Sequence, residues 1–225
     1  MTDDKLYASL LDQRLAARLS RKAREGMYRI LIERMRPSPD DTVLDVGVSV
    51  DGNGPRQESN MLEQLYPFRR NITMLGIHEG KFLEERYPGA VYVRSVPGQP
   101  FPFADRQFNV CHCNAVIEHV GREEDRRFLL NEILRVGKRV FLTTPNRWYP
   151  VELHKMIPFL HWLPQEWYRA LLRAMGDEVY GSKENLNLLS RRELDRLFRQ
   201  AGRPFEIIPY RFLGFVSNFL VVVQP

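Results

Sequence analysis

The chain has 225 residues and a net charge of +5; 44% of its residues are hydrophobic and 27% are charged. This composition is typical of a globular protein with a substantial core, and it excludes intrinsic disorder. The longest apolar stretch, Phe212 to Val223, is interrupted by Ser217 and Asn218 and is shorter than the roughly 20 residues of a membrane-spanning helix. Because the first residues lack the apolar segment of a secretory signal peptide, we expect a cytoplasmic protein.

The first 36 residues predict a basic helical arm. They carry nine Lys or Arg against five Asp or Glu. Leu11, Leu15 and Leu19 recur every four residues and would share one helix face, with the basic side chains on the other. We interpret the basic face as solvent-exposed, with contact to an anionic membrane surface or to nucleic acid as the alternative. No nucleic-acid partner is expected.

After the arm, apolar runs alternate with amphipathic segments. Five runs are typical of buried strands: 42–47, 72–77, 90–96, 108–114 and 139–143. Three segments between them are typical of helices: 58–66, 82–86 and 122–136. A further helix begins at Ser190, where Ser-Arg-Arg-Glu has the spacing of a capping box. Two strands, 205–212 and 219–223, follow it with no helix between them and must form an antiparallel pair.

This alternation predicts an α/β fold, a doubly wound, Rossmann-like, mostly parallel seven-stranded sheet with a C-terminal antiparallel strand pair. We expect one domain over residues 1–225, with the arm at 1–36 and an aromatic-rich insertion at 145–189. All three tryptophans, Trp148, Trp162 and Trp167, fall in the insertion. Its aromatic side chains would form an apolar lid or pack on the sheet, and contact with a membrane interface is a third interpretation.

The two cysteines are expected to be structural thiols. Cys111 and Cys113 lie two apart in a strand-like run and would share one face, with His112 on the other. Two cysteines exclude a disulfide framework, and no second Cys or His pair is close enough in sequence to complete a metal site. We therefore expect no metal.

Three motifs carry a family resemblance. Val43-Leu44-Asp45-Val46-Gly47 forms the first strand and its turn, Phe101 to Val110 enters the fourth strand, and Ile117-Glu118-His119 follows that strand. Together they resemble the class I S-adenosylmethionine-dependent methyltransferases, most closely the type 11 group. The resemblance runs from about Asp41 to Asn146 and implies S-adenosylmethionine as the cofactor.

The resemblance implies that the cofactor lies across the ends of the first, second and fourth strands. The residues that it assigns to the cofactor are Asp45, Gly47, Ser49, His78, Glu79, Phe103 and Asn114. Asp45 would engage the cationic amino group of the cofactor, directly or through water, with a buried carboxylate that caps the following loop as the alternative. Gly47 would open the turn. His78 occupies the position of the family's ribose-binding acid, and we prefer the adjacent Glu79 as the ribose ligand.

The chain also departs from the family pattern. The family's Gly-x-Gly-x-Gly falls on Gly47, Ser49 and Asp51, and Pro97 stands where an acid often contacts the adenine amino group. The adenine would then rest on backbone groups and on apolar walls such as Phe101 or Phe103. A catalytically silent scaffold that acts as a binding partner is therefore the alternative function. A nicotinamide-dependent oxidoreductase would need a Gly-x-Gly-x-x-Gly turn that the first strand lacks.

The loops after the fourth and fifth strands supply candidates for the methyl acceptor. These candidates are Glu118, Asn146, Arg147, Tyr149 and Trp162. Arg147 would bind an acceptor anion, and His154 and His119 are candidate bases for an OH or NH acceptor, with structural roles as the alternative. We expect methyl transfer to a small-molecule or lipid-linked acceptor, with peripheral contact to the inner face of the membrane in the lipid-linked case.

Overall fold

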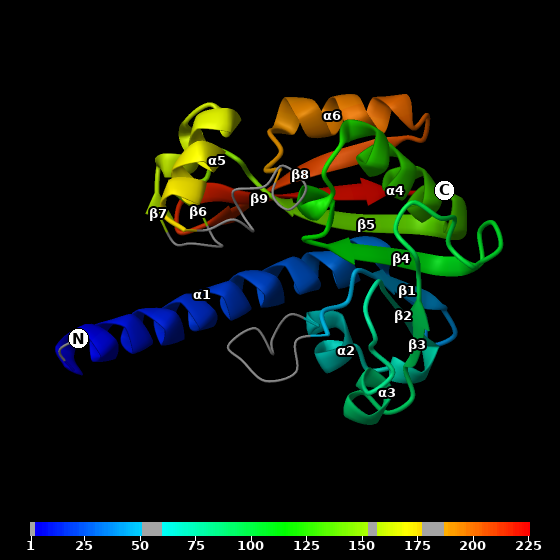
Figure 1. Cartoon of the computed structure of the whole chain (residues 1–225). Helices are drawn as coiled ribbons and strands as arrows, with labels where there is room; N and C mark the ends of the chain where they lie inside the picture. The colour runs from blue at the N-terminus through cyan, green and yellow to red at the C-terminus, as the bar shows by residue number, and fades with distance from the viewer. Residues whose placement is uncertain (1–2, 51–59, 153–156, 177–186) are drawn as a thin grey trace.

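The computed structural model describes residues 3–50, 60–152, 157–176 and 187–225. Its central element is a seven-stranded sheet with the order β3-β2-β1-β4-β5-β9-β8 (Figure 1). The strands are β1 (Val43–Val46), β2 (Ile72–Gly76), β3 (Val91–Arg94), β4 (Phe108–Asn114), β5 (Gly137–Pro145), β8 (Phe205–Phe212) and β9 (Phe215–Val223). Only β9 runs antiparallel to its neighbours, which confirms the predicted Rossmann-like sheet with its C-terminal antiparallel pair.

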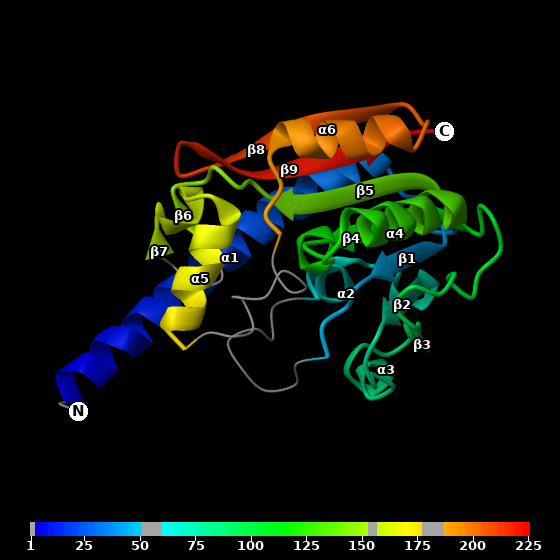
Figure 2. The same ribbon diagram turned by 45° about the horizontal axis from the view of Figure 1, so that its top comes forward.

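Helices cover both faces of this sheet (Figure 2). The helices are α1 (Asp3–Met35), α2 (Met61–Leu65), α3 (Leu83–Arg86), α4 (Glu123–Val136), α5 (Gln165–Ala174) and α6 (Arg191–Gln200). Helices α4 and α6 pack on one face through buried residues such as Ile133 and Phe198, and α1, α2 and α3 pack on the other through Leu31, Leu62 and Leu83. The capping box predicted at Ser190 is present at the start of α6. No helix in the described part of the chain combines the length and apolar character that a bilayer crossing requires.

Strand β4 shows how the two faces are separated. Cys111 and Cys113 lie in the core cluster beneath α4 and α6, whereas the His112 ring stacks on Phe141 of the opposite cluster with centroids 6.3 Å apart. Burial raises the pKa of both thiols, so neither is a reactive thiolate at neutral pH. The cysteines are free and buried, as the alternation predicted.

The N-terminal arm is a helix of 33 residues, α1, of which the C-terminal part packs on the sheet. Met27, Leu31 and Met35 recur every four residues and are buried against the strands. Gly26 allows close approach to β8, because a Cβ at this position would lie 2.1 Å from the Tyr210 hydroxyl oxygen. The N-terminal half of α1 extends away from the rest of the protein (Figures 1 and 2).

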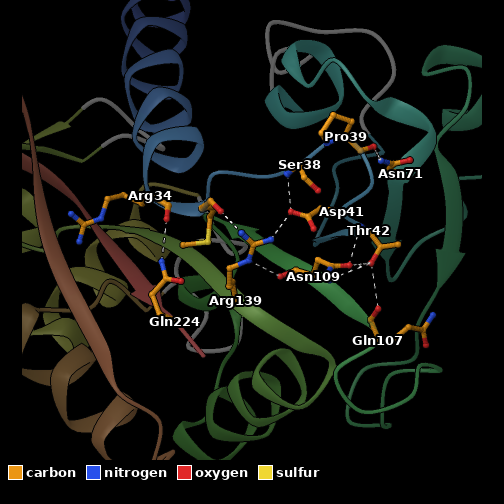
Figure 3. Close-up of polar contacts among 11 residues, drawn as sticks. Arg34, Ser38, Pro39, Asp41, Thr42, Asn71, Gln107, Asn109, Arg139 and Gln224 are labelled. Carbon is orange, nitrogen blue, oxygen red and sulfur yellow. Dashed lines mark hydrogen bonds and ion pairs between the residues drawn. The ribbon is translucent and has the colours of Figure 1, made fainter.

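Arg139 joins the end of α1 to the sheet (Figure 3). Its guanidinium donates hydrogen bonds to the Met35 carbonyl, to the Asn109 carbonyl at 3.2 Å and to the Asp41 carboxylate at 2.6 Å. One side chain thereby satisfies a terminal carbonyl of α1 and pairs with the loop that leads into β1. The position and direction of α1 depend on this contact.

We expect Arg139→Met to lower the free energy of unfolding by about 2 kcal/mol, because it leaves Asp41 and the Met35 carbonyl without their donor. The loss is smaller than for a fully buried pair, since the Arg139 and Asp41 side chains keep 19% and 14% of their exposure. Urea denaturation of the purified protein measures the change. Lys138→Met, which removes a neighbouring charge on the same strand, is the control; an equal loss there would contradict a specific role for Arg139.

Two strands are longer than the sequence analysis expected. Strand β9 begins at Phe215 rather than 219, because Leu213 and Gly214 both have positive φ values, 50° and 84°, and close a tight hairpin from β8. Strand β5 extends to Pro145, since β9 pairs with it up to Asn218. The insertion folds into α5, the 3₁₀ turn η3 (Leu160–Trp162) and a small hairpin of β6 (Val151–Glu152) and β7 (Ile157–Pro158).

Candidate functional site

The carboxyl ends of four parallel strands meet at one edge of the sheet. Val46 at the end of β1 pairs with Leu75 of β2 and with Cys113 of β4, and Asn114 pairs with Thr143 of β5. The next residue after β1, Gly47, therefore lies level with the ends of β2 and β4. Open α/β sheets bind ligands at such an edge, which makes it the candidate site.

Gly47 makes the turn that follows β1. Its φ is +83°, its N–H donates to the Leu75 carbonyl at 2.8 Å, and a Cβ added there would lie 2.3 Å from Cγ2 of Val116. Only glycine satisfies both the left-handed backbone and this close approach. The turn is thus packed directly against the segment between β4 and the 3₁₀ turn η2 (Ile117–His119).

Asn60 holds the base of the loop that begins at this turn. Its side-chain carbonyl accepts a hydrogen bond from the Ser49 N–H, and its amide donates to the Ser49 carbonyl, both at 2.9 Å. The sequence analysis did not select Asn60, which lies within the helix expected over 58–66; in the structure it precedes α2 and makes no side-chain cap. Asp51, which stands in place of a family glycine, lies outside the described residues.

Beneath the turn, Asp45 belongs to a buried polar cluster with His112 and Glu63. Nδ1 of His112 lies 2.6 Å from Oδ1 of Asp45, and the Glu63 side chain is fully buried within interaction range of Asp45. Asp45 is therefore engaged inside the protein rather than extended towards a ligand. That Asp45 engages the cofactor's amino group, directly or through water, stays a prediction.

Burial controls the protonation of this cluster. It raises the pKa of Asp45 to about 7 and lowers the pKa of His112 to about 4. Burial, followed by repulsion from Asp45, raises the pKa of Glu63 well above its usual range. At neutral pH, His112 is consequently neutral, and its contact with Asp45 is a hydrogen bond rather than an ion pair.

The second strand ends one residue earlier than expected, at Gly76, and both His78 and Glu79 are exposed beyond it. Tyr92 fixes this turn: its hydroxyl donates to the His78 carbonyl, and a Cβ added at Gly76 would lie 2.5 Å from that hydroxyl. The Glu79 carboxylate keeps 82% of its exposure and pairs with Arg94. Its side-chain oxygens are therefore accessible at the edge of the sheet.

A family model described as a methyltransferase domain, of type 11, matches residues 44–140. The protein contains a methyltransferase domain. This segment spans β1 to β4 and the start of β5, and therefore includes the Gly47 turn, Glu79 and η2. No match is found among curated proteins.

Solved structures share the fold of the whole chain at low identity. A SAM-dependent methyltransferase from Aquifex aeolicus aligns with a TM-score of 0.56 and 12% identity over 88% of each chain. A SAM-dependent methyltransferase from Thermotoga maritima, described as a possible histamine N-methyltransferase, aligns with 0.57 and 14% over 98% of this chain and 97% of its own. The N-terminal domain of EvdMO1 with SAH bound aligns with 0.51 and 17% over 87% and 78%.

Within the methyltransferase domain, Glu118 lies inside the protein. Its side chain is 0% exposed, and its carboxylate accepts a hydrogen bond from the Thr144 hydroxyl at 3.1 Å. Its carbonyl accepts from the Asn187 N–H at 2.6 Å. Glu118 therefore links η2 to β5 and to the end of the insertion, and its assignment to the acceptor stays a prediction. Asn114, the last residue of β4, accepts a hydrogen bond from the Thr143 hydroxyl.

Three further candidates divide by location. His119 is exposed on η2, at the site edge. His154 lies outside the described residues. Phe103 is not brought to this edge: its ring packs edge-to-face on Phe108 at 4.9 Å, and its carbonyl accepts from Arg135 near the end of α4. These contacts lie at the amino end of β4, where Phe103 is partly buried against the core, and its assignment to the cofactor stays a prediction.

Two of the acceptor candidates in the insertion, Asn146 and Tyr149, are buried, and the other two are accessible. Both ends of the Asn146 amide are used, by the Val216 carbonyl at 2.8 Å and the Trp148 N–H at 3.1 Å. Tyr149 is buried, and its carbonyl accepts from Nε2 of His161 at 2.8 Å, a histidine that sequence analysis did not select. Asn146 and Tyr149 thus hold the backbone of the insertion, and their assignment to the acceptor stays a prediction.

Arg147 and Trp162 remain accessible beside this frame. The Arg147 guanidinium stacks over the Trp148 ring at 5.0 Å. Trp162 is 41% exposed and meets Trp148 and Phe159 edge-to-face at 6.4 and 4.9 Å. An exposed cluster of aromatic rings next to a guanidinium suits an acceptor that has both an apolar and an anionic part.

Proposed function

We propose that the methyltransferase domain binds S-adenosylmethionine at the carboxyl edge of its sheet and transfers the methyl group to a small-molecule or lipid-linked acceptor. The observation that carries this proposal is the Gly47 turn, left-handed and packed on Val116 at the point where β1, β2 and β4 end together. It stands inside the segment that matches the family model.

The residues at this edge fit the cofactor. Glu79 offers an exposed carboxylate that could accept hydrogen bonds from the ribose hydroxyls, and Arg94 pairs with it at the same edge. The methionine end would meet the backbone of the Gly47 turn, since Asp45 is occupied by His112. Asp45 then acts as a positioning residue, one contact removed from the ligand.

When bound, S-adenosylmethionine supplies an electrophilic methyl group on a sulfonium sulfur. The protein's share of the work is to hold the acceptor atom in line and to accept the proton that an OH or NH acceptor loses. We assign the proton to His119, which is exposed on η2. Arg147 and Trp162 would orient the acceptor through its charge and its apolar surface.

The second candidate is a silent scaffold that binds a partner and no cofactor. It is favoured by one observation, the engagement of Asp45 with His112 inside the protein. The two functions differ in a single property, the affinity for S-adenosylmethionine and S-adenosylhomocysteine.

Isothermal titration calorimetry with both compounds tests the proposal. We expect binding by the parent protein and about tenfold weaker binding by Glu79→Ala, which loses a charge-assisted hydrogen bond to the ribose. Glu85→Ala, on the exposed side of α3, is the control and should bind like the parent. No heat from either compound at millimolar concentration would establish the silent scaffold instead.

A further inference from the structure

A second feature at the same edge of the sheet is a cavity of about 710 Å³ formed by the segment after β5, the start of α6 and the β8–β9 hairpin. Four arginines line it: Arg147, Arg191, Arg192 and Arg211. Its volume is within the roughly 300–1,000 Å³ of small-molecule sites, far larger than one ion needs. The cavity therefore has room for a ligand that carries its charge on a larger body.

The arginines of this cavity lack carboxylate partners. Among the residues that the structure describes, none of the four forms an ion pair, although eight other arginines of the described chain do. Arg191, Arg192 and Arg211 are exposed, and they come from two different elements. Because like charges repel, four cations in one cavity favour an anionic ligand.

Glu193 is the one acid among the described residues that line the cavity. Its carboxylate accepts hydrogen bonds from the N–H of Ser190 at 2.8 Å and from the Ser190 hydroxyl at 2.6 Å. These contacts form the capping box of α6 and direct the carboxylate to the helix end. It offsets one of the four positive charges, so the lining keeps an excess of three.

Two of the guanidinium groups are held in place. Arg147 stacks on Trp148, and its Nε is buried without a hydrogen-bond partner. Arg211 donates to the Gly214 carbonyl at 3.4 Å within the hairpin. Guanidinium groups fixed in this way still present further N–H donors, which match the paired oxygens of phosphate.

We infer that this cavity binds a phosphate-bearing group and that this group anchors the methyl acceptor; the second part rests on the proposed function. A carboxylate needs one guanidinium, whereas a phosphate ester carries up to two charges and several acceptor oxygens. Trp148, which lines the cavity and is 49% exposed, provides apolar surface for the rest of the ligand. The phosphate belongs to a soluble ester or to an anionic lipid headgroup.

The test measures binding of glycerol 3-phosphate by calorimetry and co-sedimentation with phosphatidylglycerol vesicles, with phosphatidylcholine vesicles as the neutral reference. The variant is R192Q/R211Q, and the control is R196Q/R199Q, which removes two exposed arginines of α6 that do not line the cavity. We expect the variant to bind at least about tenfold more weakly and the control to bind like the parent.

Binding of the ester alone identifies a soluble phosphate, and binding of the anionic vesicles alone identifies a lipid headgroup; either supports the inference if it depends on the cavity arginines. Equal weakening in the control, or no binding of either probe by the parent, overturns it. Titration of each variant with S-adenosylhomocysteine separates the two proposals. Phosphate binding without cofactor binding would contradict the proposed methyl transfer and support the phosphate site. Cofactor binding without phosphate binding would support the methyl transfer and contradict the phosphate site.

Discussion

Gly47→Ala is expected to weaken S-adenosylhomocysteine binding about 100-fold, because the added Cβ clashes with Val116 and displaces the turn proposed to meet the cofactor. The new Cβ would lie 2.3 Å from Val116, so the β1 turn and the segment before η2 must move apart. The left-handed backbone adds a penalty of about 1–2 kcal/mol for any residue other than glycine. Calorimetry gives the affinity, and urea denaturation gives the stability.

The chain supplies a control for each part of this effect. Gly202 has a φ of +74° and nothing within 4 Å of an added Cβ, so Gly202→Ala should show the backbone penalty alone and leave cofactor binding unchanged. Adding Val116→Ala to Gly47→Ala should restore part of the lost affinity by making room. If Gly47→Ala binds like the parent, the β1 turn does not contact the cofactor.

Glu63→Gln should raise the free energy of unfolding by about 2 kcal/mol near pH 8, because it removes a buried carboxyl that the folded parent must keep protonated beside Asp45. Glutamine keeps the shape and polarity of the protonated acid. The folded pKa of Glu63 is raised, so the folded state retains a proton that the unfolded chain releases above about pH 4.3. The stability of the parent therefore falls as the pH rises through that range.

The titration of Asp45 and His112 does not mask this dependence of stability on pH. In the unfolded chain His112 holds a proton up to about pH 6.5 and Asp45 releases its own above about pH 3.9. In the folded protein the pKa of His112 is about 4 and that of Asp45 about 7. Between about pH 4 and 6.5, folding thus moves one proton from His112 to Asp45, and the opposing slopes of the pair cancel.

Urea denaturation over a pH series checks this prediction. The Glu63→Gln variant should show a flatter profile than the parent in mildly acidic solution and a growing advantage towards pH 8. Glu85→Gln, an exposed change nearby in sequence, should follow the parent throughout. A variant that is less stable than the parent at every pH would show that the Glu63 carboxyl is a structural hydrogen-bonding group.

The sheet could be predicted because burial leaves a simple pattern in the sequence. Parallel strands covered on both faces are continuous apolar runs, and β1, β2 and β4 were located by that property. The start of β9 was missed because Ser217 and Asn218 resemble a strand boundary. Both are buried at 2% and 5% exposure, and the real boundary is the positive-φ pair at Leu213 and Gly214.

The site was predictable where topology alone decides. Gly47 and Glu79 come to one edge because parallel strands end together. The partner of Asp45 was not predictable, since His112 is 67 residues away in sequence and only the register of β1 on β4 places the two side by side. The location of Phe103, in contrast, could have been predicted from the direction of the chain. Phe103 precedes β4, and residues that precede a parallel strand lie at its amino end, away from the candidate site.

Helix α1 makes the approach to this edge unequal on its two sides. From Gly26 to its N-terminal end, α1 is about 35 Å long at 1.5 Å per residue. In Figures 1 and 2 this length passes beyond the carboxyl ends of β4 and β5. A bulky molecule that arrives from the α1 face must therefore pass this projecting helix before it reaches the strand ends, whereas on the α6 face it meets the shorter α5 and the β6–β7 pair. The association rates of docking partners should therefore depend on their size and on the face from which they approach.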